Sequence, residues 1–112
     1  MKIAQLIAGR AADDVIACVT EARVVDVIAL LADKRIGAMP VLEVGRVAGI
    51  FSERDVVYRM AQEGAACLDR KVGEVMTAPA ITVEPDTQVL EALALMTRRR
   101  IRHLPVVDQG MM

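Results

Sequence analysis

Apolar side chains recur at helical spacing in two segments of the chain. Within residues 22–35 they stand at positions 24, 27, 28 and 31, and within residues 87–100 they stand at positions 89, 90, 93 and 96. This is the spacing of a helix with one buried face. Asp86 or Thr87 can cap the start of the second helix, and the basic residues at its end suit the negative pole of the helix dipole. The pattern therefore predicts two amphipathic helices.

Short runs of apolar and β-branched residues indicate strands on either side of these helices. Residues 16–19 and 81–83 precede the two helices and favour strands. After the first helix, residues 39–44 and 47–51 form two apolar runs around a turn at Gly45-Arg46. Two apolar runs separated by so short a turn predict a β-hairpin.

A further helix follows the hairpin. It opens at Ser52 and runs to about residue 62. The first copy of this arrangement therefore has the element order β-α-β-β-α. We predict an α/β (α+β) fold in which the second copy follows the same order as far as its hairpin turn.

The chain repeats itself at a spacing of 65 residues. Residues 24–36 and residues 89–101 share, in the same order, an acidic residue, an apolar helix face, a basic end and an isoleucine. The correspondence continues without a gap through Pro40 over Pro105, Val41 over Val106 and Gly45 over Gly110. Two unrelated amphipathic helices would not also share the proline and the glycine. The chain therefore contains two copies of one structural unit.

A weaker similarity links residues 2–7 to residues 71–76 at a spacing of 69. The four extra residues fall in the loop 10–14, where insertion is tolerated. We therefore divide the chain into four parts: an N-terminal helix and loop (1–15), a first repeat (16–64), a linker (65–79) and a second, incomplete repeat (80–112).

The second repeat stops just after its hairpin turn, whereas the first continues into a strand and a helix. A strand at residues 106–108 would then lack its hairpin partner and present unpaired backbone groups, an edge that proteins normally cover. We expect either a further C-terminal segment or another chain that supplies the missing strand, and we favour the first.

Composition excludes several functions. Of the 112 residues, 54% are apolar and 26% are charged, which is typical of a globular domain. Phe51 and Tyr58 are the only aromatic residues, so the stacking platforms of single-stranded nucleic-acid binders are missing. The net charge of −1 gives no field that favours nucleic acid or an anionic membrane. A nucleic-acid partner is therefore not expected.

Metal binding and catalysis have little support. Cys18 and Cys67 lie far apart and form no metal-binding pattern, which favours two reduced thiols in a cytoplasmic protein. His103 is the single histidine and has no nucleophile motif near it. The apolar stretches are interrupted by acidic residues and are too short to span a membrane. We predict no enzyme activity, no metal site and no required cofactor.

Ser52-Glu53-Arg54-Asp55 follows a strand and opens a helix, and it has two interpretations. Ser-x-x-Asp at this place predicts a capping box, with no need of a ligand. The same helix N-terminus suits a phosphate, and the Asp55 carboxylate has acceptors for both hydroxyls of a ribose. The two interpretations are compatible, and the sequence leaves both open.

The junctions between helix and strand also have two interpretations. They read Ile36-Gly37-Ala38-Met39-Pro40 and Ile101-Arg102-His103-Leu104-Pro105. Simple loop geometry explains the prolines. The basic residues near these junctions are more often a solvated face than a binding site, and Arg102 is the one most suited to face a phosphate.

These motifs resemble the cystathionine-beta-synthase (CBS) domain-pair family. The most specific are G-I-F-S-E-R-D, at residues 49–55, and R-H-L-P-V-V, at residues 102–107. The likeness extends from residue 3 to residue 110 and is nearest to small bacterial members that carry no fused catalytic domain. It implies a regulatory module in which an adenine nucleotide, S-adenosylmethionine or NAD(H) occupies a cleft between two pseudo-symmetric repeats.

The resemblance also implies which residues contact the ligand. The family's Ser/Thr-x-x-Asp motif contacts phosphate and ribose and maps onto the segment from Ser52 to Asp55. Its adenine and sugar contacts map onto the first strand and the residues ahead of the hairpin proline. Together the expected nucleotide-binding residues are Ile16, Ala17, Cys18, Ala38, Met39, Pro40, Ser52, Arg54, Asp55, Ile81, Thr82, Arg102, His103, Leu104 and Pro105.

Relatives in this family pair two modules, and two-fold symmetry is the commonest arrangement of soluble homo-oligomers. We therefore expect a homodimer whose ligand is AMP, ADP, ATP or a related adenosine-containing molecule, with a target protein as a further possible partner. The alternative is a structural or dimerisation module whose clefts are empty.

Overall fold

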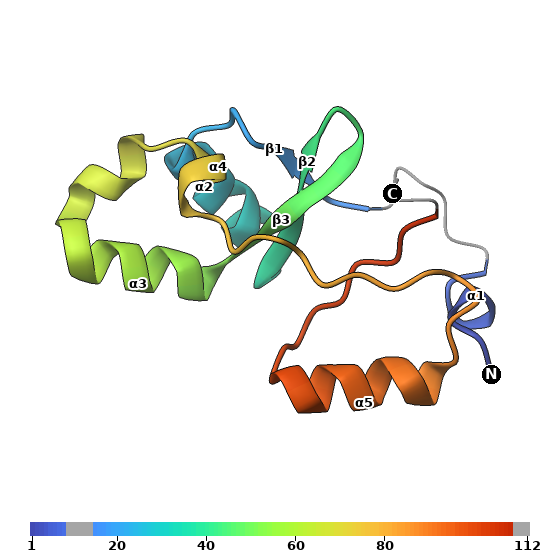
Figure 1. Ribbon diagram of the computed structural model, residues 1–112. Helices are drawn as coiled ribbons and strands as arrows, with labels where there is room; N and C mark the ends of the chain where they lie inside the picture. The colour runs from blue at the N-terminus through green and yellow to red at the C-terminus, as the bar shows by residue number, and fades with distance from the viewer. Residues whose placement is uncertain (9–14, 109–112) are drawn as a thin grey trace. The chain divides into compact units, whose positions relative to one another are not determined.

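The computed structural model describes residues 1–8 and 15–108, and the expected loop 10–14 and Gly110 lie outside these residues. The chain forms two compact units. One contains the two ends of the chain, residues 1–15 and 81–112, and the other contains residues 16–80 (Figure 1). Both are built from helices and extended segments, in agreement with the predicted mixed fold.

A three-stranded sheet forms the framework of the unit 16–80. The strands β1 (Cys18–Val19), β2 (Ala38–Glu43) and β3 (Arg46–Ser52) lie in that order. β1 is parallel to β2, and β2 and β3 form the predicted antiparallel hairpin. β1 is shorter than the strand predicted over residues 16–19.

The hairpin turn is one residue earlier than predicted. Val44 and Gly45 form it, with φ of 52° and 79°, and Arg46 already belongs to β3. Positive φ at both central positions is the geometry that lets a two-residue turn follow the twist of the strands. A β-branched residue rarely adopts it, which is why the sequence pointed instead to Gly45-Arg46.

The core of this unit lies between one face of the sheet and two helices. The helix α2 (Val24–Lys34) buries the predicted apolar stripe, and the short helix α4 (Val72–Val75) adds to it. Alternate residues of β2 and β3 face the same core, as expected for a sheet with one buried face. The buried cluster is Val24, Val27, Leu31, Met39, Val41, Phe51, Val72 and Val75.

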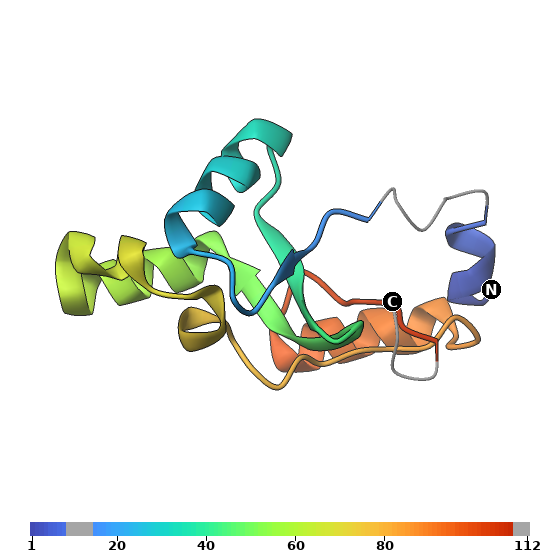
Figure 2. The same ribbon diagram turned by 90° about the horizontal axis from the view of Figure 1, so that it is seen from above.

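The predicted helix after the hairpin is α3 (Glu53–Glu63), and the 3-10 helix η2 (Gly64–Asp69) continues from it. α3 contacts η2, α4 and β3. Figure 2 shows the unit from above, with α3 and α2 as separate helices and η2 leading the chain back toward α4. This return brings the linker alongside the sheet.

The unit formed by the chain ends has a smaller core. The helices α1 (Ile3–Leu6) and α5 (Val89–Arg99) belong to it, and its buried cluster consists of Ile3, Val83 and Ala92. The strands predicted at residues 81–83 and 106–108 are not formed as such. Val83 and Val106 make a single parallel bridge, and within the described residues no hairpin partner extends it.

The predicted cap of the second helix is wrong. Gln88, rather than Asp86 or Thr87, is the N-cap of α5, and its side chain makes no capping bond. The Thr87 hydroxyl instead accepts a hydrogen bond from the Glu84 N–H at 3.2 Å. The Val89 N–H at the start of α5 donates to the Met1 carbonyl oxygen at 2.9 Å. A backbone group far away in sequence thus takes the place of a side-chain cap.

In both repeats, the N–H at the start of the main helix donates to a backbone oxygen of a segment far away in sequence. The Val24 N–H donates to the Arg70 carbonyl oxygen at 2.9 Å, as Val89 does to Met1 in the other unit. The linker segment with α4 therefore closes the first repeat, and the N-terminal segment with α1 closes the second. The weak similarity between residues 2–7 and 71–76 corresponds to this shared role.

The helix ends also correspond. Arg35 and Arg100, 65 residues apart, both adopt the left-handed conformation that ends a helix, with φ of 54° and 55°. The following N–H donates back in each case, from Ile36 to the Leu31 oxygen and from Ile101 to the Met96 oxygen. The structure of these helices thus confirms the repeat.

After α4 the linker pairs with the free edge of β3. The N–H of Ile50 donates to the Thr77 oxygen at 2.9 Å, and the N–H of Thr77 donates to the Ile50 oxygen at 2.8 Å. Because Ile50 uses both backbone groups on this side, its pair with Pro40 in β2 needs no hydrogen bond. This is a position where the missing N–H of proline costs nothing.

Gly49 makes this approach possible. A Cβ atom at Gly49 would lie 2.6 Å from the Thr77 carbonyl oxygen and 2.8 Å from the Met76 sulfur. A real side chain does not fit at these distances, and the obstacle at Thr77 is backbone. The linker can pair with β3 only because residue 49 has no side chain.

We predict that Gly49→Ala lowers the free energy of unfolding by about 1–3 kcal/mol, the usual cost of overpacking a filled site. Gly37→Ala is the matched control, since the nearest atom to its Cβ would be 3.9 Å away. Urea unfolding followed by circular dichroism measures both. Equal stability of the two variants would show that the linker does not pack against Gly49.

Candidate functional site

The start of α3 is a capping box, as the sequence predicted. The Asp55 N–H donates to Ser52 Oγ at 3.3 Å, and the Ser52 N–H donates to Asp55 Oδ2 at 2.9 Å. The Ser52 hydroxyl lies 3.1 Å from the same carboxylate oxygen. The local hydrogen bonds of the box thus fix both side chains at the end of β3.

A third residue joins this pair, one that sequence reasoning missed. The hydroxyl of Thr77, in the linker, donates to Asp55 Oδ1 at 2.7 Å. Ser52 occupies one carboxylate oxygen and Thr77 contacts the other, so three of the about four acceptor positions of a carboxylate are used. The sequence signals this residue only as a threonine directly after Val75 and Met76 in the linker.

The register of the hairpin sorts the other expected residues by face. Ala38 lies opposite Ser52, and Pro40 lies opposite Ile50, so these side chains share one face of the sheet. Met39 lies on the other face, where it is only 2% exposed and belongs to the core. The side chain of Met39 is therefore not available to a ligand, whereas Ala38 and Pro40 are half-buried beside Ser52.

The first strand contributes residues of mixed exposure. Ile16 and Cys18 pack against the core cluster, and Ala17 is half-buried. Cys18 pairs with Val41 of β2, and burial raises the pKa of its thiol to about 11. A thiol with so high a pKa stays protonated at neutral pH and is a poor nucleophile. Cys18 is a free cysteine, as the sequence predicted.

Arg54 extends into solvent at the first turn of α3. Next to it, the Glu53 N–H donates to the Gly37 oxygen at 3.0 Å and ties the helix start to the loop before β2. Ala38, Ser52, Asp55 and Thr77 thus meet where β2 begins and β3 ends. This corner of the unit 16–80 is the candidate site.

An ion-pair cluster holds the linker behind this corner. Glu63, at the end of α3, binds Arg70 at 2.9 Å and Arg59 at 3.2 Å, while Arg70 also binds Glu74 of α4 at 3.3 Å. Arg59 donates a further hydrogen bond to the Glu74 carbonyl oxygen at 2.9 Å. The hydrogen bond from Arg70 holds the pKa of Glu63 below its usual value. The cluster joins α3 to α4 at Glu74, three residues before Thr77.

The expected residues of the second repeat lie in the other compact unit. Arg102 and His103 are exposed, Ile81, Thr82 and Leu104 are half-buried, and Pro105 is buried. The Pro105 carbonyl oxygen accepts the Val83 N–H at 3.0 Å, so this proline helps to form the bridge between the two extended segments.

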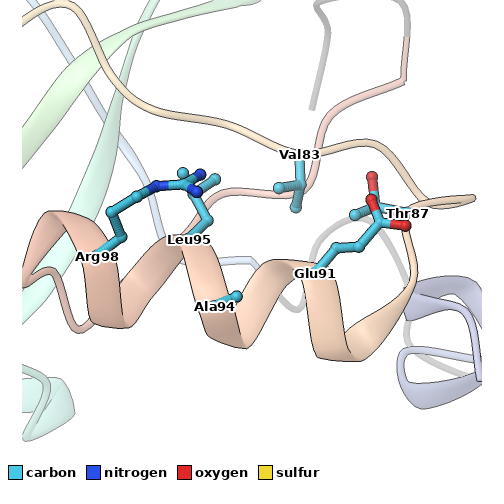
Figure 3. Close-up of a pocket in the computed structure, with 6 residues that line it drawn as sticks. All are labelled: Val83, Thr87, Glu91, Ala94, Leu95 and Arg98. Atoms are coloured by element: carbon cyan, nitrogen blue, oxygen red, sulfur yellow. The ribbon is translucent and has the colours of Figure 1, made fainter.

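A hollow lies on α5 of that unit (Figure 3). Figure 3 shows Glu91 and Thr87 at one end of it and Arg98 and Leu95 at the other. The lining residues are Val83, Thr87, Glu91, Ala94, Leu95 and Arg98. None of them belongs to the expected nucleotide-binding set.

Across residues 1–8 and 15–108, no group of three or more His, Cys, Asp or Glu side chains could hold a metal ion. In the same part of the chain, no helix is long and apolar enough to cross a membrane.

Known proteins with similar sequences identify the family of this chain. The CBS domain family profile matches residues 8–62 and 72–112. A mitochondrial CBS domain-containing protein of Arabidopsis thaliana, CBSX3, is 40% identical over 100 residues, which cover 84% of this chain and 48% of the relative. The chain spans about half the length of the curated relatives that it matches first.

Solved structures share the fold. A protein with CBS domains from Burkholderia ambifaria superposes with a TM-score of 0.85 at 34% identity, over 99% of this chain and 83% of that one. Two more distant structures contain ligands. CBSX2 in complex with AMP has a TM-score of 0.82 at 22% identity, over 98% of this chain and 84% of that one.

The second is the CBS domain pair of protein MJ0100 with 5′-methylthioadenosine and S-adenosyl-L-methionine. Its TM-score is 0.82 at 20% identity, over 99% of this chain and 83% of that one. At these identities the two ligand-bound structures establish likeness of fold. The profile match over both repeats, together with the capping box and the repeated helix ends, shows that this chain belongs to the CBS domain family as a tandem pair.

Proposed function

We propose that this chain is a regulatory module that binds an adenosine-containing ligand through the first repeat. CBS domain pairs are ligand-sensing modules, and the related structures hold AMP, 5′-methylthioadenosine or S-adenosyl-L-methionine. These three molecules share an adenosine group and differ in what is attached to its 5′ carbon. A site for this class must therefore recognise a ribose and a base.

The observation that supports the proposal is the open acceptor position on Asp55. Ser52 and Thr77 leave about one of its lone pairs free, which suits one ribose hydroxyl instead of the two expected from the sequence. A phosphate, where the ligand has one, would suit the N–H groups at the start of α3 and the Ser52 hydroxyl. Arg54 supplies a nearby positive charge.

Ala38 and Pro40 would contact the base or sugar, because they share the sheet face of Ser52. Ile16, Ala17, Cys18 and Met39 stay predicted contacts, although the side chains of Ile16, Cys18 and Met39 pack in or against the core. Ile81, Thr82, Arg102, His103, Leu104 and Pro105 stay predicted contacts from the second repeat. A cytoplasmic location likewise stays a prediction.

Asp55→Ala should weaken binding of AMP by about 1.5–3 kcal/mol, or roughly 10- to 150-fold, the scale of hydrogen bonds to a charged group. Glu53→Ala is the matched control, because it removes a carboxylate from the same helix turn, with the same dipole effect, and should leave the affinity unchanged. Isothermal titration calorimetry with AMP, S-adenosylmethionine and NADH measures the three proteins.

One result would count against this function and another against the role of Asp55. If no adenosine compound binds the wild-type chain or raises its melting temperature, the module is structural and its sites are empty. If AMP binds and Asp55→Ala binds it equally well, Asp55 serves only as a helix cap.

We further propose a homodimer, supported by the surface of α3. Among the described residues of this helix none is fully buried, and Val57 and Tyr58 are each 62% exposed while Met60 is 41% exposed. Apolar side chains this exposed on one helix favour a partner surface. A second copy of the chain offers the same helix, and two-fold pairing buries both at once.

Light scattering should give twice the chain mass of 12.1 kDa at high micromolar concentration. The double variant Val57→Glu, Tyr58→Glu should shift the protein to the monomer, because charges are costly in an apolar interface. Ala32→Glu adds a charge at an exposed position of α2 instead of α3 and should stay dimeric. A monomeric wild-type protein would contradict the dimer, and a dimeric double variant would contradict pairing through α3.

A further inference from the structure

The Asp55 carboxylate is held at both of its oxygens by different parts of the chain. Ser52 holds Oδ2 through its N–H and its hydroxyl, both within the capping box. Thr77 holds Oδ1 from the linker, 22 residues away in sequence. The terminal torsion of an aspartate is broad, so a bond at one oxygen leaves the direction of the other loosely set. The contact with Thr77 therefore adds orientation that the capping box alone does not provide.

The main chain that carries the Thr77 hydroxyl is fixed in place. Two backbone hydrogen bonds to Ile50 hold its main chain, and Met76 beside it packs against the bare backbone of Gly49. The ion pairs of Arg70 with Glu63 and Glu74 anchor the preceding helix. Because these contacts do not involve Asp55, Thr77 sets the direction of Oδ1, whereas the capping box holds the carboxylate through Oδ2.

We propose that Thr77 is a positioning residue for ribose recognition. It acts through Asp55, turning the carboxylate so that the one unused acceptor position is offered to a ribose hydroxyl. The inference rests on the proposed function and adds a residue of the linker to it. In the N-terminal segment that closes the second repeat, Ala8 stands where Thr77 stands in the linker, so that segment has no hydroxyl at this place.

The test separates orientation from stability with two variants. Thr77→Val keeps the branched shape and the backbone pairing but has no donor, while Thr77→Ser keeps the hydroxyl. Affinities for AMP, 2′-deoxy-AMP and 3′-deoxy-AMP are measured by calorimetry, and melting temperatures confirm that each variant is folded. The difference in affinity between AMP and each deoxy analogue shows which ribose hydroxyl donates a hydrogen bond to Asp55.

Thr77→Val should bind AMP about three- to tenfold more weakly, the effect expected of one hydrogen bond. One of the two deoxy analogues should bind the wild-type protein more weakly than AMP does. Thr77→Val should bind that analogue with nearly the wild-type affinity, so the ratio of the affinities for AMP and for the analogue falls. Thr77→Ser should restore both values.

Three outcomes would overturn the inference while Asp55→Ala still weakens AMP binding. The first is unchanged affinity for AMP in Thr77→Val. The second is an equal loss of affinity for AMP and both analogues, which indicates a structural role. The third is tighter binding of AMP, which indicates that Thr77 competes with the ribose. If the wild-type chain bound no adenosine compound at all, that result would instead overturn the proposed function, and this inference with it.

Discussion

The pairing of the linker with β3 is the interaction on which the first repeat depends. Two backbone hydrogen bonds join Thr77 to Ile50, and they form only because Gly49 has no side chain to keep the linker away. The same approach brings the Thr77 hydroxyl to Asp55 and places α4 over the core. Because Gly49 has no side chain, one segment of the linker can contact the sheet, the core and the candidate site.

Much of the first repeat could be predicted because its determinants are local. The hairpin, α3 and the capping box each arise from residues within a few positions of one another. The repeat was visible because helix faces, prolines and glycines recur in order. Local spacing is what sequence patterns describe well.

The rest was missed because its partners are distant and mostly backbone. Carbonyl oxygens of Met1 and Arg70 accept the first N–H groups of α5 and α2, and any residue type can supply such an oxygen. Thr77 contacts Asp55, 22 positions away in sequence, because the chain turns back after α3. The composition of this segment does not predict that turn. The positive φ of Val44 likewise contradicts the preference of its side chain.

Hydrogen exchange tests the central claim most directly, because it reports on the backbone pairing itself. The account predicts that the amides of Thr77 and Ile50 exchange as slowly as those of the β2–β3 ladder, and that both lose this protection in Gly49→Ala while the ladder keeps it. Rapid exchange of Thr77 and Ile50 in the wild-type protein, with the ladder still protected, would contradict it.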